Sequence, residues 1–250
     1  MRVVRVGYRE QTFYAAFYSD HVRPLDRNVH APESIPLEEI ELKRSVQPSK
    51  VVCVGLNYHA HAQELGREIP QEPLIFLKPP SSVIGPGEPI RLPAQSDNVH
   101  YEGELAIVMG RLCSGVSVEE APAYVFGYTC ANDVTARDLQ ERDVQYTRAK
   151  GFDTFCPLGP CIETELNPQE EVEIRTVQNG EIRQQGRTSD MVFPPARLIS
   201  FISGVMTLNP GDVILTGTPP GVGILRPGDR IGVEIEGPGL LENTVQGQCS

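Results

Sequence analysis

The segment NVHYEGELAIVMG, residues 98–110, has the composition of a β-strand and yet carries two glutamates. Side chains alternate across a strand, so Glu102, Glu104 and Ala106 share one face. Leu105 lies on the opposite face. If the glutamate face is buried, two carboxylates lie close together in a low dielectric, which is costly without a compensating cation. Taken alone, the pattern fits a solvated strand face more often than a site.

The composition predicts a soluble globular protein with a sizeable core. The chain has 250 residues, of which 40% are hydrophobic and 22% are charged, and both fractions are ordinary. Its formal net charge of −11 argues against nucleic acid as the main partner, since phosphate binding needs a basic face. No apolar run reaches the 18 or so residues of a membrane span, and the N-terminus does not resemble a signal peptide.

The six cysteines form no C-x-x-C pair, and several of them lie in apolar surroundings such as VVCVG and YTCAND. Small buried thiols of this kind are typical of a reducing compartment, so we expect a cytoplasmic protein without a cysteine-based zinc site. The cysteines are Cys53, Cys113, Cys130, Cys156, Cys161 and Cys249.

The order of strand signals predicts two regions. Residues 1–50 form a small N-terminal lobe of paired strands followed by a polar, proline-containing segment, too small to be stable alone. Residues 51–250 are strand-dominated and form the catalytic domain. Within them, Asn179-Gly180 predicts a hairpin, and the apolar spacing of residues 195–208 predicts an amphipathic helix. The expected class is mainly β (α+β).

A third carboxylate strengthens the interpretation of the two glutamates as a site. Asp133 directly follows the apolar run VFGYTCAN, at the point where a strand would end. Three carboxylates on neighbouring strands would form an all-oxygen site for Mg²⁺, Mn²⁺ or Ca²⁺. No histidine or cysteine accompanies them at ligand spacing, which disfavours zinc.

A histidine and a glutamate follow the strand signal of VGLNYHAHAQELG, residues 54–66. His61 and Glu64 are three residues apart, so in a helix they share a face and can pair. A carboxylate beside an imidazole fixes its tautomer and raises its basicity, as a water-activating base requires. The spacing of His59 does not suit such a pair. The alternative is an exposed helix with incidental polar contacts.

Two further segments carry polar groups that could contact an anionic substrate. Arg137, Gln140 and Lys150 lie in a region of mixed charge that ends in GFDTFCPLGP, and Lys150 could direct its ammonium at an anion. In LTGTPPGVG, the hydroxyls of Thr216 and Thr218 could hold a carboxylate. Such turns and charged helices more often have only a structural role.

Six motifs together resemble those of the fumarylacetoacetate hydrolase superfamily. The resemblance extends over residues 51–245, and residues 1–50 resemble the short extension of its single-domain bacterial members. It implies a mixed β-sandwich roll, usually assembled as a homodimer. The motifs, in chain order, are GLNY, FLKPPSSVIGPG, YEGELAIVMG, NDVTARDLQ, KGFDTFCPLGP and LTGTPPGVG.

The resemblance also implies a role for ten residues. A divalent metal, Mg²⁺ or Mn²⁺ with Ca²⁺ as a further candidate, is held by an E-x-E pair and an aspartate, which match Glu102, Glu104 and Asp133. A catalytic His–Glu pair on a lid helix, as in the acylpyruvase and oxaloacetate decarboxylase branch, matches His61 and Glu64. The remaining matches are the catalytic Lys150 and the substrate-binding residues Tyr58, Arg137, Gln140 and Thr216.

The function implied by the resemblance is metal-dependent chemistry on a small 2-oxo or diketo acid through its enolate. The His–Glu pair favours C–C bond hydrolysis of acylpyruvate or fumarylpyruvate type, or decarboxylation of oxaloacetate type. The alternative is an isomerase of aromatic catabolism acting on 2-hydroxyhepta-2,4-diene-1,7-dioate or 5-carboxymethyl-2-hydroxymuconate. A ligand-binding relative without catalysis is less favoured, because every residue of the metal triad is present.

Overall fold

The segment of residues 98–110 forms two strands rather than one in the computed structural model, which describes residues 1–247. These strands are β10 (Val99–Tyr101) and β11 (Gly103–Met109), and Glu102 lies at the break between them. β10 belongs to a small three-stranded sheet, whereas β11 lies near the middle of the largest sheet. Two sheets therefore meet at the predicted site.

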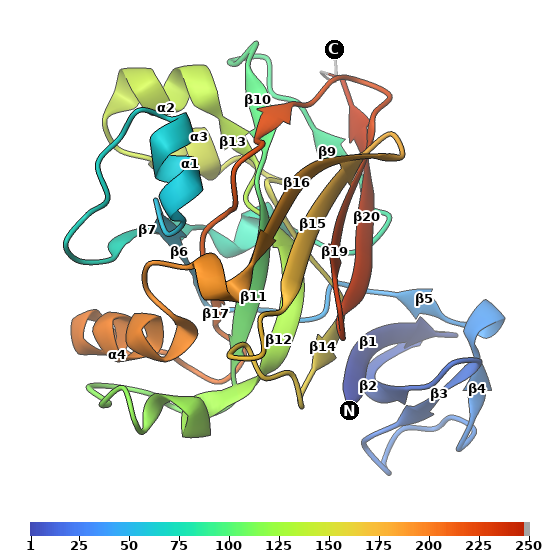
Figure 1. Ribbon diagram of the computed structural model, residues 1–250. Coiled ribbons are helices and arrows are strands. Elements are labelled where there is room, and N and C mark those ends of the chain that lie inside the picture. Colours follow the sequence, from blue (N-terminus) through green and yellow to red (C-terminus); the bar gives the residue numbers. More distant parts are fainter. Residues whose placement is uncertain (248–250) are drawn as a thin grey trace.

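The largest sheet has twelve strands and runs through the whole molecule (Figure 1). Its main path is β4-β3-β2-β1-β14-β12-β11-β17-β6-β7, while β5 pairs with β1 and β8 pairs with β14. Its strands are β1 (Arg2–Tyr8), β2 (Gln11–Phe17), β3 (His21–Pro24), β4 (Ile35–Pro36), β5 (Glu41–Leu42), β6 (Val51–Gly55), β7 (Leu74–Lys78), β8 (Val83–Ile84), β11 (Gly103–Met109), β12 (Val125–Asn132), β14 (Cys156–Glu163) and β17 (Val213–Leu215).

A five-stranded sheet packs face to face on β11, β12 and β14, which makes a sandwich (Figure 1). It has the order β16-β15-β19-β20-β9, and the third sheet has the order β13-β10-β18. The strands of these two sheets are β9 (Ile90–Arg91), β10 (Val99–Tyr101), β13 (Thr135–Ala136), β15 (Glu173–Gln178), β16 (Glu181–Arg187), β18 (Gly223–Ile224), β19 (Arg230–Ile235) and β20 (Gly239–Gln246).

The core of the sandwich follows from the alternation along β11. Leu105 and Ile107 point into an apolar cluster that includes Ile174 of β15 and Val233 of β19. Ala106 belongs to a second cluster on the other face of the large sheet. The predicted alternation is confirmed, but every residue of β11 is buried, since both faces of the strand are covered. The predicted class, mainly β (α+β), is also confirmed.

Four α-helices and four 3₁₀ turns complete the described chain. α2 and α3 pack together near β10 and β13, and α4 lies against the 3₁₀ turn of residues 121–124 (Figure 1). The predicted helix is confirmed as α4, and the predicted hairpin is confirmed as β15–β16. The helices are α1 (His59–Glu64), α2 (Arg137–Asp143), α3 (Thr147–Lys150) and α4 (Pro195–Val205), and the 3₁₀ turns are Leu37–Glu39, Pro80–Ser82, Ala121–Tyr124 and Thr188–Asp190.

The N-terminal strands join the main sheet through the pairing of β1 with β14. They nevertheless have an apolar cluster of their own, which contains Val4, Val6, Phe13 and Val22 and takes Cys161 from β14. The division of the chain at residue 50 stays a prediction.

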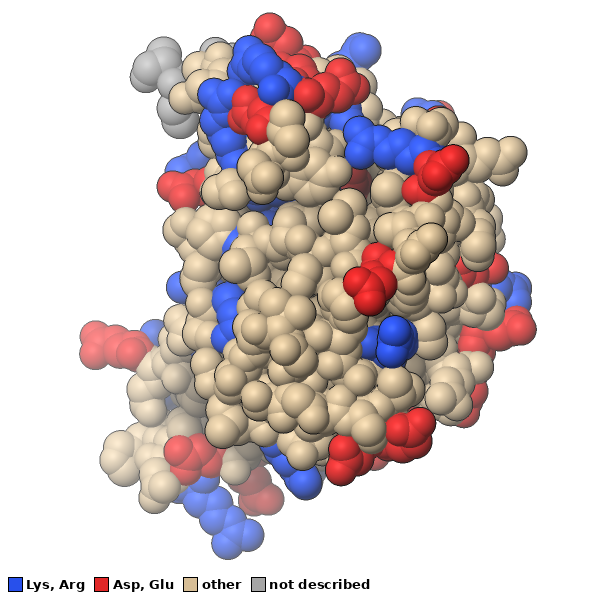
Figure 2. All heavy atoms as spheres, turned by 90° about the vertical axis from the view of Figure 1, so that its left-hand side faces the viewer, with Lys and Arg blue, Asp and Glu red and all other residues tan. Residues whose placement is uncertain are grey.

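The charged side chains of the surface, the lengths of the helices and the state of the cysteines complete the description of the fold. On the side that carries the helices, acidic and basic side chains are scattered around a largely uncharged surface (Figure 2). None of the helices in residues 1–247 combines the length and the apolar character needed to cross a membrane. Five cysteines are buried and free of disulfides, and Cys249 lies outside the described residues.

Candidate metal centre and active-site cleft

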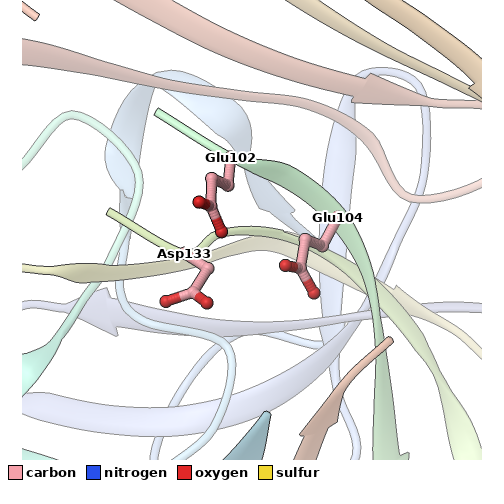
Figure 3. A group of neighbouring side chains, drawn as sticks. All are labelled: Glu102, Glu104 and Asp133. Atoms are coloured by element: carbon pink, nitrogen blue, oxygen red, sulfur yellow. The ribbon is translucent and has the colours of Figure 1, made fainter. Parts of the chain in front are cut away.

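The three predicted carboxylates lie together where β11 begins and β12 ends (Figure 3). The pairing of β11 with β12 places Gly103 opposite Asn132, which brings Glu102 next to Asp133. Each carboxylate is buried, and one oxygen of each lies within 4.8 Å of those of the other two. Such a set of hard oxygen donors fits a divalent cation of the magnesium or manganese type.

The break in the strand at Glu102 has a local cause. The backbone N–H of Glu102 donates to the side chain of Asn132, and that of Gly103 donates to Gln184 on β16. A Cβ atom at Gly103 would lie 2.0 Å from the Thr176 hydroxyl, so only glycine allows β11 to pass this close to β15. The glycine between the two glutamates is therefore required by the packing of the two sheets.

Three cations offset the buried negative charge. The Lys150 ammonium donates to Glu102 at 2.7 Å and to Asp133 at 2.6 Å, and Arg137 donates to the other oxygen of Glu102. Lys78 at the end of β7 donates to Asp133 at 2.5 Å and to the Val134 carbonyl at 3.0 Å. Lys78 was not among the site residues predicted from the sequence. The sequence feature that could have indicated it is a lysine at the end of the apolar strand LIFLK.

Glu104 is the carboxylate of the triad without a cation of its own. It accepts the backbone N–H of Gly217, and no salt bridge to it is found within residues 1–247. Burial, together with the charges of Asp133 and Glu102, raises the pKa of Glu104 well above its ordinary value. A divalent cation between the three carboxylates would supply the missing charge, so these residues fit a metal site.

Glu102 shows the opposite electrostatic balance. Burial alone would raise its pKa, but the positive charges of Lys150 and Arg137 outweigh burial and lower the pKa of Glu102. For Lys150, burial acts to lower the pKa, and the charges of Asp133 and Glu102 reverse this and raise it. Both groups are therefore held in their charged forms.

His61 and Glu64 form a hydrogen-bonded pair on α1. His61 is buried, and its Nδ1 lies 2.9 Å from Glu64 Oε2. Because an ionised carboxylate can only accept, the imidazole donates from Nδ1 and keeps Nε2 as a base. Glu64 is held in turn by the backbone N–H of Gly221 at 3.0 Å. This second contact ties α1 to the TPPG turn.

One cleft collects most of the residues predicted from the sequence. It is lined by polar and charged side chains together with the apolar residues Val54, Leu56, Leu65 and Phe76. Glu64 lies behind His61 and does not line it. Seven of the ten predicted residues line the cleft, and these are His61, Glu102, Glu104, Asp133, Arg137, Gln140 and Lys150.

Two of the ten residues lie in the structure around the cleft rather than in its lining. The Tyr58 ring belongs to the apolar cluster of the sandwich, and the Thr216 hydroxyl donates to the Leu105 carbonyl at 2.9 Å. Their roles as substrate contacts stay predictions. Thr218, two residues after Thr216, lines the cleft, and its hydroxyl donates to the Gly103 carbonyl.

The mouth of the cleft contains three residues that the sequence analysis missed, Arg67, Phe76 and Tyr146. The rings of Tyr146 and Phe76 pack edge to face, with their centres 5.4 Å apart. The Lys150 ammonium lies 4.9 Å from the centre of the Phe76 ring. Phe76 precedes Lys78 by two residues on β7, so the two side chains point to the same side of that strand. This spacing was the available sequence signal for Phe76.

Comparison with known proteins identifies a family model that covers most of the chain. The model of the fumarylacetoacetate (FAA) hydrolase C-terminal domain matches residues 50–246. Protein Rv2993c of Mycobacterium tuberculosis is 52% identical over 214 residues, which cover 85% of this chain and 81% of that protein. The oxaloacetate tautomerase YisK of Bacillus subtilis is 42% identical over 223 residues, which cover 84% of this chain and 74% of that protein.

A solved structure extends the likeness to the whole chain. The crystal structure of 5-carboxymethyl-2-hydroxymuconate delta-isomerase from Mycobacterium smegmatis superposes with a TM-score of 0.92 and 46% sequence identity. The match covers 100% of both chains, so it includes the N-terminal strands as well as the cleft. The fold, the buried acidic triad and the family match lead to one conclusion: this chain belongs to the fumarylacetoacetate hydrolase family.

Proposed function

We propose that the protein is a divalent-metal-dependent enzyme that acts on small 2-oxo acids through their enol or enolate form. The preferred reaction is cleavage of a C–C bond, either hydrolysis of a diketo acid of the acylpyruvate or fumarylpyruvate type or decarboxylation of the oxaloacetate type. The observation that carries the proposal is one cleft lined by the buried acidic triad and by His61, whose Nδ1 is held by Glu64 from outside the lining.

The acidic triad would hold the cation. Mg²⁺ or Mn²⁺ bound by Glu102, Glu104 and Asp133 would act as a Lewis acid toward the 2-oxo acid and favour its enolate. The three ligands, the low exposure of the site and the lack of a cation at Glu104 support this assignment. The exchange of Mg²⁺ for Mn²⁺ or Ca²⁺ in purified protein would identify the preferred ion.

The charged residues beside the triad would bind and orient the substrate. Lys150 is fully charged in the cleft and could stabilise an oxyanion that develops on the substrate. Arg137 donates to Gln140 as well as to Glu102, which fixes both side chains at the wall of the cleft. This arrangement suits the recognition of a carboxylate and a carbonyl oxygen.

His61 would transfer the proton. Glu64 holds its Nδ1–H, and Nε2 is then the basic nitrogen. In hydrolysis, His61 would take a proton from a water that attacks the distal carbonyl, and the C–C bond electrons would pass to the 2-oxo acid fragment. In decarboxylation, the same enolate would form by loss of CO₂ without an attacking water.

A second candidate is proton transfer alone, as in a tautomerase or isomerase. It is favoured by the names of two relatives, the oxaloacetate tautomerase of Bacillus subtilis and the muconate-type isomerase of Mycobacterium smegmatis. A His–Glu base could move a proton between C3 and a solvent molecule with the same residues in place. The two candidates therefore differ in products rather than in the groups required.

The Glu64→Gln variant tests the choice of reaction. Protein loaded with Mg²⁺ would be assayed with acylpyruvates, oxaloacetate and the heptadiene dioate. We expect C–C hydrolysis to fall by about 10²–10⁴-fold in the variant, because general-base assistance is lost. Decarboxylation should persist. Oxalate affinity should stay close to that of the parent, which shows that binding at the metal is intact.

The matched control is Glu68→Gln, an exposed glutamate on the loop after α1 that undergoes the same chemical change. It should retain parental rates. Hydrolysis at the parental rate in Glu64→Gln would refute the role of the His61–Glu64 pair and would favour the isomerase candidate.

We also propose that the enzyme is a homodimer, as the family resemblance implies. Light scattering on the purified protein measures the mass directly. A mass equal to the 27.5 kDa of one chain would contradict this assembly.

A further inference from the structure

Arg67 is a cationic residue of the cleft with no acidic partner in the described chain. The guanidinium donates to the Tyr146 hydroxyl at 3.2 Å, and no carboxylate of residues 1–247 lies within salt-bridge distance of it. Arg137 and Lys150, the other cations in the lining, are both paired with acidic groups. An arginine left with unused donors at the mouth of a small polar cleft is available to an anion.

The position of Arg67 separates it from the metal triad. It lies on the loop that follows α1, while Tyr146 directly precedes α3, whose last residue is Lys150. Tyr146 contacts Phe76, and the Lys150 ammonium lies over the same ring. The wall of the cleft therefore runs from Lys150 at the carboxylates, past Phe76 and Tyr146, to Arg67 at the mouth.

This wall has two cationic ends with an aromatic surface between them. A 2-oxo acid held at the triad, as under the proposed function, would direct the rest of its chain along Phe76 and Tyr146. A methyl or alkyl end would leave the Arg67 donors to water. A carboxylate end would meet a planar guanidinium whose paired N–H groups match the geometry of its two oxygens.

We propose that Arg67 is a specificity-determining residue that binds the second carboxylate of the substrate, so that the enzyme selects dicarboxylic 2-oxo acids over monocarboxylic ones. The inference rests on the proposed function, because it takes the first carboxylate and the 2-oxo group to bind at the triad. The Tyr146 hydroxyl would position the guanidinium, and the N–H groups that Tyr146 does not use would bind the carboxylate.

Two ligands of matched size test this directly. Oxaloacetate and 2-oxobutanoate have the same four-carbon chain, and they differ in whether a carboxylate or a methyl group stands at the distal end. Affinities for the Mg²⁺-loaded protein would be measured by thermal shift and by inhibition, together with kcat and KM for each compound that is turned over. The variants are Arg67→Met and Arg67→Lys.

We expect Arg67→Met to weaken oxaloacetate binding by about tenfold or more, since a hydrogen-bonded contact between charged groups is lost. The loss should fall on KM rather than on kcat, and 2-oxobutanoate binding should stay within about twofold. Arg67→Lys should restore part of the affinity, because it keeps the charge without the paired donors. The control is Arg142→Met, which removes the same charge from an exposed arginine on α2 outside the cleft.

Two results would overturn the inference. If Arg67→Met weakened both ligands equally and Tyr146→Phe reproduced that loss, Arg67 would only fasten the loop after α1 to the turn before α3. If Arg142→Met had the same effect as Arg67→Met, the general charge of the protein would be responsible. Should the parent turn over no 2-oxo acid and yet prefer oxaloacetate in an Arg67-dependent way, the proposed function would fail and the inference would stand.

Discussion

Two buried carboxylate sites lie at opposite ends of the same three strands, β11, β17 and β6. At one end, Asp212 directly precedes β17, and Lys50 directly precedes β6. At the other end, Glu104 of β11 meets the turn that follows β17. The pairing of β17 with both neighbours fixes this arrangement, since Val213 lies opposite Val108 and Val51.

The two ends differ in how many donors reach the carboxylate. Asp212 accepts five hydrogen bonds from Ser49, Lys50 and Asn209, and one of them comes from the Lys50 ammonium at 2.5 Å. Glu104 accepts the N–H of Gly217. A fully satisfied carboxylate stabilises the loops that donate to it, whereas one with unused oxygen lone pairs in a buried site is available to a cation.

The pKa values reflect this difference. Burial alone would raise the pKa of Asp212, but its bonds from Lys50, Asn209 and Ser49 outweigh burial and lower it. Burial and two neighbouring carboxylates raise the pKa of Glu104. We infer that the hydrogen bonds to Asp212 stabilise the sheet. At the triad end, the unpaired Glu104 lowers the free energy of unfolding and is available to a cation.

The largest change in the free energy of unfolding is expected from a comparison of two lysines, each of which forms a salt bridge with a buried aspartate. The Lys78 side chain is 0% exposed and that of Lys50 is 21% exposed. Lys78→Met should destabilise the metal-free protein by about 3–5 kcal/mol, because it leaves Asp133 short of a charge in a fully buried site. Added Mg²⁺ should recover part of the loss, since the cation replaces the missing positive charge.

Lys50→Met is the matched control. Its loss should be about 1–2 kcal/mol, because water reaches the pair, and Mg²⁺ should not change it. Denaturant unfolding in EDTA and in excess Mg²⁺ measures both variants. Equal Mg²⁺ responses in the two variants would show that Lys78 does not belong to the metal site.

The next effect concerns Asp212 itself. Asp212→Asn should cost about 2–3 kcal/mol, since the amide keeps the shape but presents two donors to groups that also donate. Its binding of Mg²⁺ should equal that of the parent. The measurement is the free energy of unfolding together with a metal titration. A variant with parental stability would contradict the structural role of this end of the sheet.

Glu104→Gln should lose Mg²⁺ binding and keep the stability of the metal-free protein, which is the reverse of the result expected for Asp212→Asn. At a Mg²⁺ concentration one hundred times the dissociation constant, the parent gains about 2.7 kcal/mol from the metal, and the variant should gain none. Activity should be lost with it. In EDTA the variant should be at least as stable as the parent, because one buried negative charge is removed from the triad. Retained metal affinity in Glu104→Gln would refute the triad as a metal site.

The comparison also shows what the sequence could predict. Glu102, Glu104 and Asp133 were recognisable because each lies at a fixed place on a strand with a clear signal, and His61 and Glu64 because they are one helical turn apart. The break in the strand at Glu102 was not predictable from the sequence. It depends on the side chains of Asn132 and Gln184, which accept the backbone N–H groups of residues 102 and 103.

The site features that could not be predicted from the sequence depend on long-range contacts. Lys78 meets Asp133 across 55 residues of sequence, and Lys50 meets Asp212 across 162. Arg67 meets Tyr146 across 79. No periodicity or spacing encodes such pairs, because they depend on strand order and crossing loops. The order of the strands in the large sheet was likewise beyond the sequence signals.

The smallest effect is the pH dependence of stability, and its sign should differ between the two ends. A group whose folded pKa is raised, such as Glu104, contributes stability below its unfolded pKa, and this contribution is lost as the pH rises through the folded pKa. A group whose folded pKa is lowered, such as Asp212, contributes stability above its unfolded pKa of 3.8, and this is lost as the pH falls.

Unfolding in EDTA between pH 3 and pH 8 separates the two contributions. The parent should lose stability relative to Glu104→Gln as the pH rises above about 4.5, with a slope of at most about 1.4 kcal/mol per pH unit for one proton. Relative to Asp212→Asn, the parent should lose stability only below about pH 4. Saturating Mg²⁺ should remove the Glu104 slope and leave the Asp212 slope unchanged, because the cation competes with a proton at one end of the sheet only. A Glu104 slope that persisted in Mg²⁺ would mean that the metal binds elsewhere.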